Sequence, residues 1–553
     1  MPTKLALASF YTLALLFGFL FAVLFAVMYF LEVINAAWLF GLTIGINVLI
    51  WLIGPHITDF IQKLFYKMKF LSREEFQKEY PALEAFIATV ARDNKIRFPK
   101  MGIIDDQNPT AFTYGSGAFN ARIILAKGLF TYLSQEELEA VTAHELGHIV
   151  HRDFIVMAIA NTIIQLLYEL SQVLFRQKGK KGKDKGGALA IIGAVSYIFY
   201  WIGYYIVLYL SRIRETFADE FSARATGNPH ALSNALIKIA YGMIATGDTK
   251  RSDRLIKSTQ TLGIMGIKAS KGVGLAAMAT NMDTQKIGRV LLYDFVSPWA
   301  KLAELGSTHP LTGKRLERLD RIAKKIGKQE LFQIGHLLQD NIVDKKKLWN
   351  NFFSGIFMAY LPNSIAAAGV LALGVVYFNT ETASAFSSIA LLIVMLFFPL
   401  LGMSIIIKAL YRYPSAVNAP DTNALALMSN LYATPVRGTP MAIRGSVIGR
   451  GVSGYVFSED VMLQDETGLM YLDYQSGVPL IGNLLFAWKK VKQLIGEHVI
   501  ARGWFFRSAV QSVTLQSIEH NGTFIKSYAK FWNIFFGALL IFIGIVLVTI
   551  FVS

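Results

Sequence analysis

The stretch Val141-Thr-Ala-His-Glu-Leu-Gly-His-Ile-Val150 decides how the first half of this 553-residue chain is organised. It is typical of a helix, and a spacing of four puts His144 and His148 on one helical face, where both imidazoles can bind a single ion. Glu145 lies beside that face without being a ligand, placed to take a proton from a metal-activated water. The pattern therefore predicts a zinc site with Glu145 as the general base. Two purely structural histidines on a helix are the competing interpretation.

A tetrahedral zinc site that keeps an open position requires one more protein ligand. The later stretch Ser211-Arg-Ile-Arg-Glu-Thr-Phe-Ala-Asp219 offers one, because Glu215 and Asp219 are four residues apart and share a helical face. Glu215 can be a ligand, while Asp219 can accept the N–H of a ligand histidine from outside the coordination shell. Arg212 and Arg214 would then hold these carboxylates in place. By composition alone, a solvated charged helix start explains the stretch equally well.

Composition restricts the class of protein and the kinds of chemistry. Hydrophobic residues make up 54% of the chain and charged residues only 17%, and the mean hydropathy is +0.43. The absence of cysteine excludes disulfides, thiol catalysis and cysteine-ligated zinc, so any metal must use histidine and carboxylate. The net charge of +16 comes from Lys and Arg that cluster near membrane ends, which favours anionic lipid headgroups over nucleic acid as the partner.

Long apolar runs predict a multi-pass membrane protein. A basic group (Lys63, Lys67, Lys69, Arg73) follows the second run, so the positive-inside rule puts residues 60–150 in the cytoplasm. The predicted membrane segments are residues 5–30, 37–54, 154–175, 188–210, 352–378, 385–409 and 531–552.

The pair formed by residues 154–210 does not fit that rule easily. The linker 176–187 is strongly basic, so two crossings would place positive charge outside, whereas a hairpin that does not cross would keep the rule. Asn161, Gln165 and Glu169 in the first segment suit a helix that faces protein or a cavity. Both topologies return residue 211 to the side of His144, and the choice stays open.

Two regions between the membrane segments predict β structure. Met101–Ile104 and Ile123–Ala126 are short strand-like runs, and Ser134 with Glu137 then forms a capping box that starts the helix of the histidine motif. Residues 424–527 alternate short apolar runs with glycines, which predicts a five-stranded OB-like β-barrel. Its stretch Trp504-Phe-Phe-Arg507 is interpreted as barrel core or membrane-facing rim rather than as a base-stacking surface. The region also resembles the β domain of GIDE-type membrane proteins, and we expect a protein-interaction or gating role.

These features predict seven segments. They are two transmembrane helices (1–58), the first part of a catalytic domain (59–153), an apolar hairpin (154–210), the second part with the third ligand (211–348), two transmembrane helices (349–413), the β domain (414–527) and a final transmembrane helix (528–553).

The motifs together resemble the HtpX-type membrane zinc peptidases and, more distantly, the CAAX prenyl-protein endopeptidases. The resemblance covers roughly residues 1–335 and rests on His144-Glu-Leu-Gly-His148 with Arg152-Asp153, and on Ser211-Arg-x-Arg-Glu215-x-x-Ala-Asp219. Weaker matches are Asn108 to Gly115 and Thr308-His309-Pro310 before Arg315. The resemblance implies a mainly helical zincin-type domain with a small edge sheet.

The same resemblance implies roles for individual residues. Glu215 would be the third zinc ligand, and His309 a candidate for stabilising the oxyanion of the tetrahedral intermediate. An edge strand would pair with an extended substrate backbone, and it would comprise Ala111, Phe112, Thr113, Tyr114 and Gly115.

We therefore expect a zinc metalloendopeptidase with one zinc ion per chain, acting on membrane or unfolded proteins at the cytoplasmic face of a bacterial or archaeal plasma membrane. A catalytically weak membrane scaffold with a structural zinc is the alternative. It is less favoured, because a structural site does not need the carboxylate of Glu145. A transporter is disfavoured because the spans lack paired charges and broken-helix symmetry.

Overall fold

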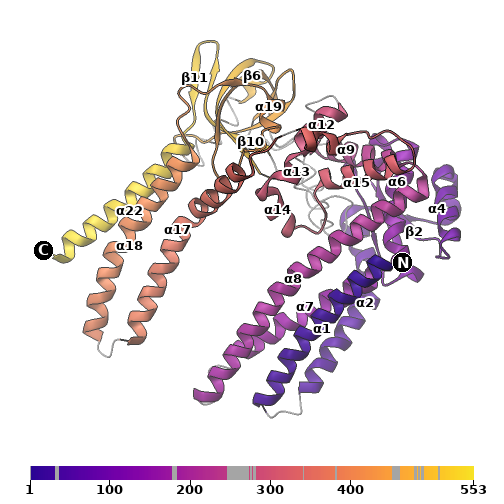
Figure 1. Ribbon diagram of the computed structural model, residues 1–553, viewed down its shortest axis with the longest axis horizontal. Helices are drawn as coiled ribbons and strands as arrows, with labels where there is room; N and C mark the ends of the chain where they lie inside the picture. The colour runs from indigo at the N-terminus through magenta and orange to yellow at the C-terminus, as the bar shows by residue number, and fades with distance from the viewer. Residues whose placement is uncertain are drawn as a thin grey trace. The chain divides into compact units, whose positions relative to one another are not determined.

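The computed structural model describes residues 2–31, 36–176, 183–245, 273–274, 277, 282–340, 342–379, 383–450, 461–478, 483, 486, 491–508 and 511–552. The contacts within the chain divide it into two compact units (Figure 1). The first unit comprises Met1–Gly274 and Lys301–Gly335, and the second comprises Leu275–Ala300 and His336–Ser553.

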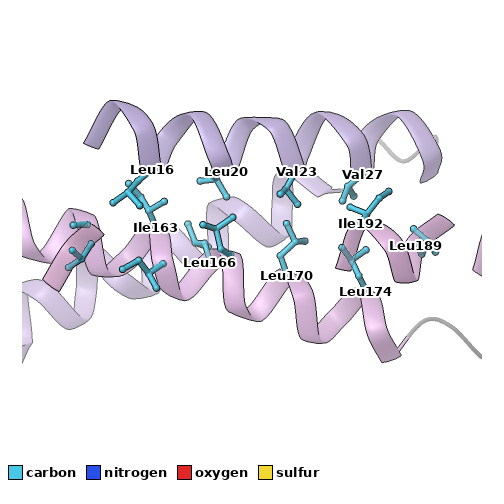
Figure 2. Close-up of a cluster of buried hydrophobic side chains, with 14 residues drawn as sticks. Leu16, Leu20, Val23, Val27, Ile163, Leu166, Leu170, Leu174, Leu189 and Ile192 are labelled. Carbon is cyan, nitrogen blue, oxygen red and sulfur yellow. The ribbon is translucent and has the colours of Figure 1, made fainter. Parts of the chain in front are cut away.

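Four long helices of the first unit form a side-by-side group. They are α1 (Thr3–Leu31), α2 (Ala36–Tyr66), α7 (Asp153–Arg176) and α8 (Lys183–Thr226). Figure 2 shows the apolar contact between α1 and α7, in which Leu16, Leu20, Val23 and Val27 face Ile163, Leu166, Leu170 and Leu174 in the same order. Helices α1 and α7 therefore run parallel, and α8 closes the cluster with Leu189 and Ile192.

Helix α8 differs from the segmentation predicted from sequence. It runs without a break through the predicted boundary between residues 210 and 211, so the apolar segment and the Glu215 stretch belong to one helix of 44 residues. Ser211-Arg-Ile-Arg contains no proline or glycine, so nothing in the local sequence ends the helix there.

A four-stranded sheet with the order β1-β2-β4-β3 supports the first unit. Its strands are β1 (Met68–Leu71), β2 (Lys100–Ile104), β3 (Ala111–Tyr114) and β4 (Arg122–Ala126). Strands β2 and β4 are parallel, and β3 pairs antiparallel with β4, placing Tyr114 opposite Arg122. Strand β3 is thus an edge strand, as the resemblance implied, and the predicted strands 101–104 and 123–126 are present.

The remaining helices of this unit pack around the sheet and carry the histidine motif. The motif helix α6 (Gln135–Val150) packs against β3 and β4. The predicted capping box is present, with the backbone N–H of Ser134 donating to Glu137 (2.8 Å) and the Ser134 hydroxyl accepting from the Glu137 N–H (3.4 Å). The others are α3 (Arg73–Glu79), α4 (Pro81–Asp93), the short 3-10 helix Ala118–Asn120, α5 (Lys127–Tyr132), α9 (Pro229–Ala245) and α15 (Thr312–Lys325).

The second unit contains a closed five-stranded barrel, which confirms the predicted OB-like domain. Successive partners around the ring are β6, β7, β8, β10 and β9, and β9 pairs back to β6; all pairs are antiparallel except β8 with β10. The barrel strands are β6 (Thr439–Arg450), β7 (Val461–Gln464), β8 (Leu469–Asp473), β9 (His498–Arg507) and β10 (Gln511–His520), with β5 (Asp421–Thr422) and β11 (Thr523–Lys526) at the edges. Trp504, Phe505, Phe506 and Arg507 are buried, in agreement with their interpretation as core.

Three long helices of the second unit pack together, and along the sequence they lie before and after the barrel. They are α17 (Lys345–Asn379), α18 (Ala383–Arg412) and α22 (Ala529–Val552). The backbones of helices α18 and α22 are in close contact. A side chain on Gly402 would collide with the carbonyl oxygen of Gly537, so glycine permits this approach. Shorter helices of the unit are α12 (Thr284–Leu291), α13 (Tyr293–Val296), α19 (Ala424–Met428) and α21 (Val491–Leu494). Helices α14 (Pro298–Leu305) and α16 (Ile334–Asp340) lie at the sequence boundaries between the units.

Seven helices in the described part of the chain are long and apolar enough to cross a membrane. They contain Thr3–Val27, Ile44–Tyr66, Asp153–Arg176, Gly187–Thr226, Lys345–Asn379, Ser388–Arg412 and Ala529–Ile550. Each corresponds to one of the seven apolar segments predicted from sequence.

Candidate active site

Helices α6 and α8 approach closely where they carry the predicted metal ligands. A Cβ added to Gly147 would lie 3.2 Å from the Cα of Ala218, so a larger residue would push the helices apart. The Ser222 hydroxyl donates to the carbonyl of Ala140 across the same contact (2.6 Å). This packing brings Glu215, on α8, to the two histidines of α6.

The three predicted ligands form a group that can hold one metal ion. The Nε2 atoms of His144 and His148 are 3.2 Å apart, and carboxylate oxygens of Glu215 lie 3.5 Å and 3.4 Å from them. A tetrahedron with metal–ligand bonds of about 2.1 Å has edges of about 3.4 Å. The three donor atoms therefore already lie at the separations that a tetrahedral ion requires.

Each histidine ring is oriented by a carboxylate on its other nitrogen. The Nδ1 of His144 lies 2.9 Å from a carboxylate oxygen of Asp219, and the Nδ1 of His148 lies 2.6 Å from one of Asp153. A carboxylate beside Nδ1 favours the proton of a neutral ring on that nitrogen, which leaves the lone pair of Nε2 for the metal position between the three donor atoms. Two lone pairs facing each other at 3.2 Å repel unless a cation, either a metal ion or a proton, is shared between them.

Burial and charge tune the protonation of these groups. Burial alone would lower the pKa of His144, but hydrogen bonds with Asp219 and Glu215 outweigh it and raise the pKa to about 9. The pKa of His148 is also raised, because the hydrogen bond with Asp153 and the charge of Glu215 overcome burial. Protons therefore compete with an incoming metal ion for the two imidazole rings.

Glu145 has the environment of a general base. Its carboxylate is 1% exposed, and neither oxygen has a hydrogen-bonding partner among the described residues. Burial raises its pKa to about 7, against the opposing positive charges of His144 and His148. A base with a pKa near the working pH takes and returns protons most effectively.

The structure corrects the predicted role of Arg212. Its guanidinium donates to the backbone carbonyls of Glu304 (2.8 Å) and Ser307 (2.7 Å), and not to Glu215 or Asp219. The arginine that holds Asp219 is Arg315 of α15, with donor distances of 2.8 and 2.6 Å to the two carboxylate oxygens. Arg212 instead fixes the loop that leads to His309.

The partner of His148 was also missed from sequence. Asp153 begins α7, and it is paired on its far side with the buried Arg214 of α8, which also donates to Ser9 (2.8 Å) and the carbonyl of His151 (3.1 Å). Arg152 between α6 and α7 has a φ of +60°, a left-handed turn that folds Asp153 back toward His148. The sequence did offer a signal for Asp153, because this residue follows the histidine motif closely.

The remaining predicted residues lie as follows. His309 is buried, with its Nε2 3.6 Å from Glu215 and its Nδ1 2.9 Å from the Thr308 hydroxyl, so it borders the metal group. Ala111, Phe112, Thr113 and Tyr114 form β3, which packs against α6, and Gly115 follows it directly.

Comparisons with known proteins agree with this geometry. Residues 77–323 match the model of peptidase family M48. The HtpX protease homologue of Thermoplasma acidophilum is 30% identical over 335 residues, which cover 58% of this chain and 98% of that protein. The chain belongs to the HtpX-type peptidases of family M48.

Other relatives show the same pattern of coverage. The HtpX protease homologue of Methanothermobacter thermautotrophicus is 33% identical over 43% of this chain and 86% of its own length, and that of Aquifex aeolicus is 32% identical over 47% and 77%. The crystal structure of S. mikatae Ste24p is similar with a TM-score of 0.33 at 18% identity, over 58% of this chain and 67% of that one. The family assignment rests on the sequence relatives.

Membership and the seven apolar helices together make this M48 chain an integral-membrane metallopeptidase. The family match ends at residue 323, so it does not include the barrel of the second unit.

Proposed function

We propose that this M48 protein is a zinc-dependent membrane endopeptidase in which Glu145 is the general base. The observation that carries the proposal is the position of Glu145, a buried carboxylate without a hydrogen-bonding partner, directly beside the His144–His148–Glu215 group. A structural metal site has no use for such a carboxylate, because an unpartnered buried polar group is costly.

The histidine and carboxylate donors suit zinc, one ion per chain. When bound there, zinc supplies a Lewis acid that activates water and polarises a peptide carbonyl. Glu145 takes the proton of the attacking water and delivers it to the leaving amine. His309, at the border of the site, donates a hydrogen bond to the oxygen of the scissile carbonyl as negative charge develops on it. Asp219, Asp153 and Arg315 keep the ligands in place.

Strand β3 binds the substrate in this proposal. It pairs with β4 and with no other strand among the described residues, so its second edge can add an extended peptide backbone. It also packs against α6, which carries Glu145. The substrates would be membrane or misfolded proteins presented in extended form, in quality control or processing.

The active site would face the cytoplasm. Lys63 lies in the last turn of α2, and Lys67 and Lys69 follow the helix; these basic residues favour the inner side. Because α7 runs parallel to α1 over the contact from Leu16 to Val27, we infer that α7 and α8 also cross the bilayer. The basic linker after α7 is then an exception to the charge rule. Relatives from archaea and a bacterium support a plasma membrane location.

The test measures zinc content and casein cleavage in detergent for the wild type and Glu145→Gln. If both bind about one zinc ion and only the wild type cleaves, the proposal stands. If zinc is bound and the wild type cleaves neither casein nor membrane-protein substrates, the zinc is structural and the scaffold alternative replaces the proposal.

A further inference from the structure

The end of strand β3 is tied to the membrane helix α2 as well as to its own sheet. The hydroxyl of Tyr114, the last residue of β3, donates to the carboxylate of Asp59 on α2 (2.7 Å). Arg122, which faces Tyr114 on β4, donates to both oxygens of the same carboxylate, through Nε and Nη2, at 3.1 Å each. One carboxylate of α2 therefore joins the edge strand and its neighbour.

A second contact ties the turn after β3 to the same helix. The Ser116 hydroxyl donates to the backbone carbonyl of Trp51, which lies eight residues before Asp59 on α2. The side-chain oxygen of Asn120 accepts from the backbone N–H groups of Ser116 (2.8 Å) and Gly117 (3.2 Å), which closes the turn. The strand end and the turn are thus both held against α2.

These contacts are buried, although the surrounding face of α2 is not. Asp59, Tyr114, Ser116 and Arg122 are each at most 8% exposed, whereas apolar side chains of the same part of α2, such as Phe60, are open. Burial and the hydrogen bond with Asp59 raise the pKa of Tyr114, so its hydroxyl stays a donor at neutral pH.

The energetics favour a positional role over a stabilising one. A buried ion pair adds little net stability, because desolvation offsets the attraction. An apolar side chain at Asp59 would suit a membrane-spanning helix better, and an ionisable residue in a span usually marks a functional position. A carboxylate that accepts charge-assisted and bidentate hydrogen bonds from two strands at once does fix the geometry of both strands relative to α2.

We propose that Asp59 is a positioning residue for substrate binding. Through Tyr114 and Arg122 it holds β3 in the position at which a peptide strand paired with β3 reaches Glu145. The helix that anchors the protein in the bilayer then also sets the position of the substrate-binding strand. This inference rests on the proposed function, since it requires that substrate pairs with β3.

The test uses the full-length protein in lipid nanodiscs and a fluorogenic peptide long enough to pair along β3. Tyr114→Phe removes only the hydroxyl and keeps the ring in its apolar cluster of Phe112, Ile104 and Ile124. Tyr80→Phe is the matched control, because its hydroxyl donates to Glu79 over a similar 2.8 Å at the surface. Asp59→Asn and the double variant with Tyr114→Phe complete the set.

The expected result is a KM for Tyr114→Phe about tenfold higher than that of the wild type, the equivalent of one lost hydrogen bond to a charged group, with kcat within about twofold. Zinc content should match the wild type and the variant should remain fully folded at the assay temperature, and Tyr80→Phe should change neither constant. The increase in KM in the double variant should be smaller than the two single effects combined, because both changes act on the same contact.

Three outcomes would overturn the proposal. The first is an unchanged KM in folded, zinc-loaded Tyr114→Phe. The second is an equal loss in Tyr80→Phe, and the third is a loss of zinc or stability that accounts for the activity change, as a purely structural role would give. A wild type that cleaves no peptide at all would contradict the proposed function instead, so the two failures are distinguishable.

Discussion

Replacing Asp153, whose carboxylate contacts His148, should lower the affinity for zinc, and the loss should be larger when more of the contact is removed. Asp153 lies 2.6 Å from the Nδ1 of His148 and is also the partner of Arg214, whose guanidinium is buried. Asp153→Asn keeps an acceptor for the ring but loses the charge, and Asp153→Ala loses both. Replacing such a partner typically costs 10- to 100-fold in metal affinity. We expect about tenfold for the Asn variant and about 100-fold for the Ala variant, roughly 1.4 and 2.7 kcal/mol.

The assay is a competition titration of zinc between the apo-protein and a chromophoric chelator. The control is Asp105→Asn, because Asp105 forms an exposed pair with Lys127 (2.9 Å) away from the metal group. Arg214 loses its buried counter-charge in both variants, so thermal unfolding of the apo-proteins is measured alongside to separate folding from metal binding. Zinc affinities for both Asp153 variants within about threefold of the wild type would refute the reasoning that this carboxylate orients the ring.

Three further predictions follow from the same geometry. Arg315→Lys should weaken zinc binding by about tenfold in the same titration, because an ammonium cannot make both contacts to Asp219. Arg318→Lys is the control and should have no effect, because its partner is Glu220 and not Asp219. Zinc affinity should rise from pH 7 and level off near pH 9, because the raised pKa values of His144 and His148 make protons the competitors at lower pH; a flat profile between pH 7 and 9 would contradict it. Removing the metal with a chelator should abolish cleavage and lower the melting temperature, because zinc at 100 times its Kd adds about 2.7 kcal/mol to the stability of the native state, and re-addition of zinc should restore both.

Interactions that are local in the chain could be predicted well. The helical spacing of His144 and His148, the Ser134–Glu137 capping box and the lengths of the apolar segments depend on geometry that repeats within a few residues. The alternation of apolar residues and glycines likewise predicted the β-barrel, since strand period and turn chemistry are local properties. Asp219 as the partner of His144 followed from its place one turn after Glu215 on the same helix.

The support of the site was predicted less well, because it depends on residues far apart in the chain. Arg212 was the nearest cation to Glu215 in sequence, yet its side chain reaches backbone carbonyls, and Arg315 takes the carboxylate of Asp219 from almost 100 residues further along.

The sequence by itself therefore determined the kind of chemistry, the family and the membrane character of this protein, because motif spacing, residue type and apolar length do not need a partner elsewhere in the chain. Only the tertiary structure decided which charged groups orient the ligands and how the strand beside the site is held. Asp59, Asp153 and Arg315 contact Tyr114, His148 and Asp219, which lie on other helices or strands. Such partners depend on how two elements pack against each other, and the sequence around each residue does not contain that information.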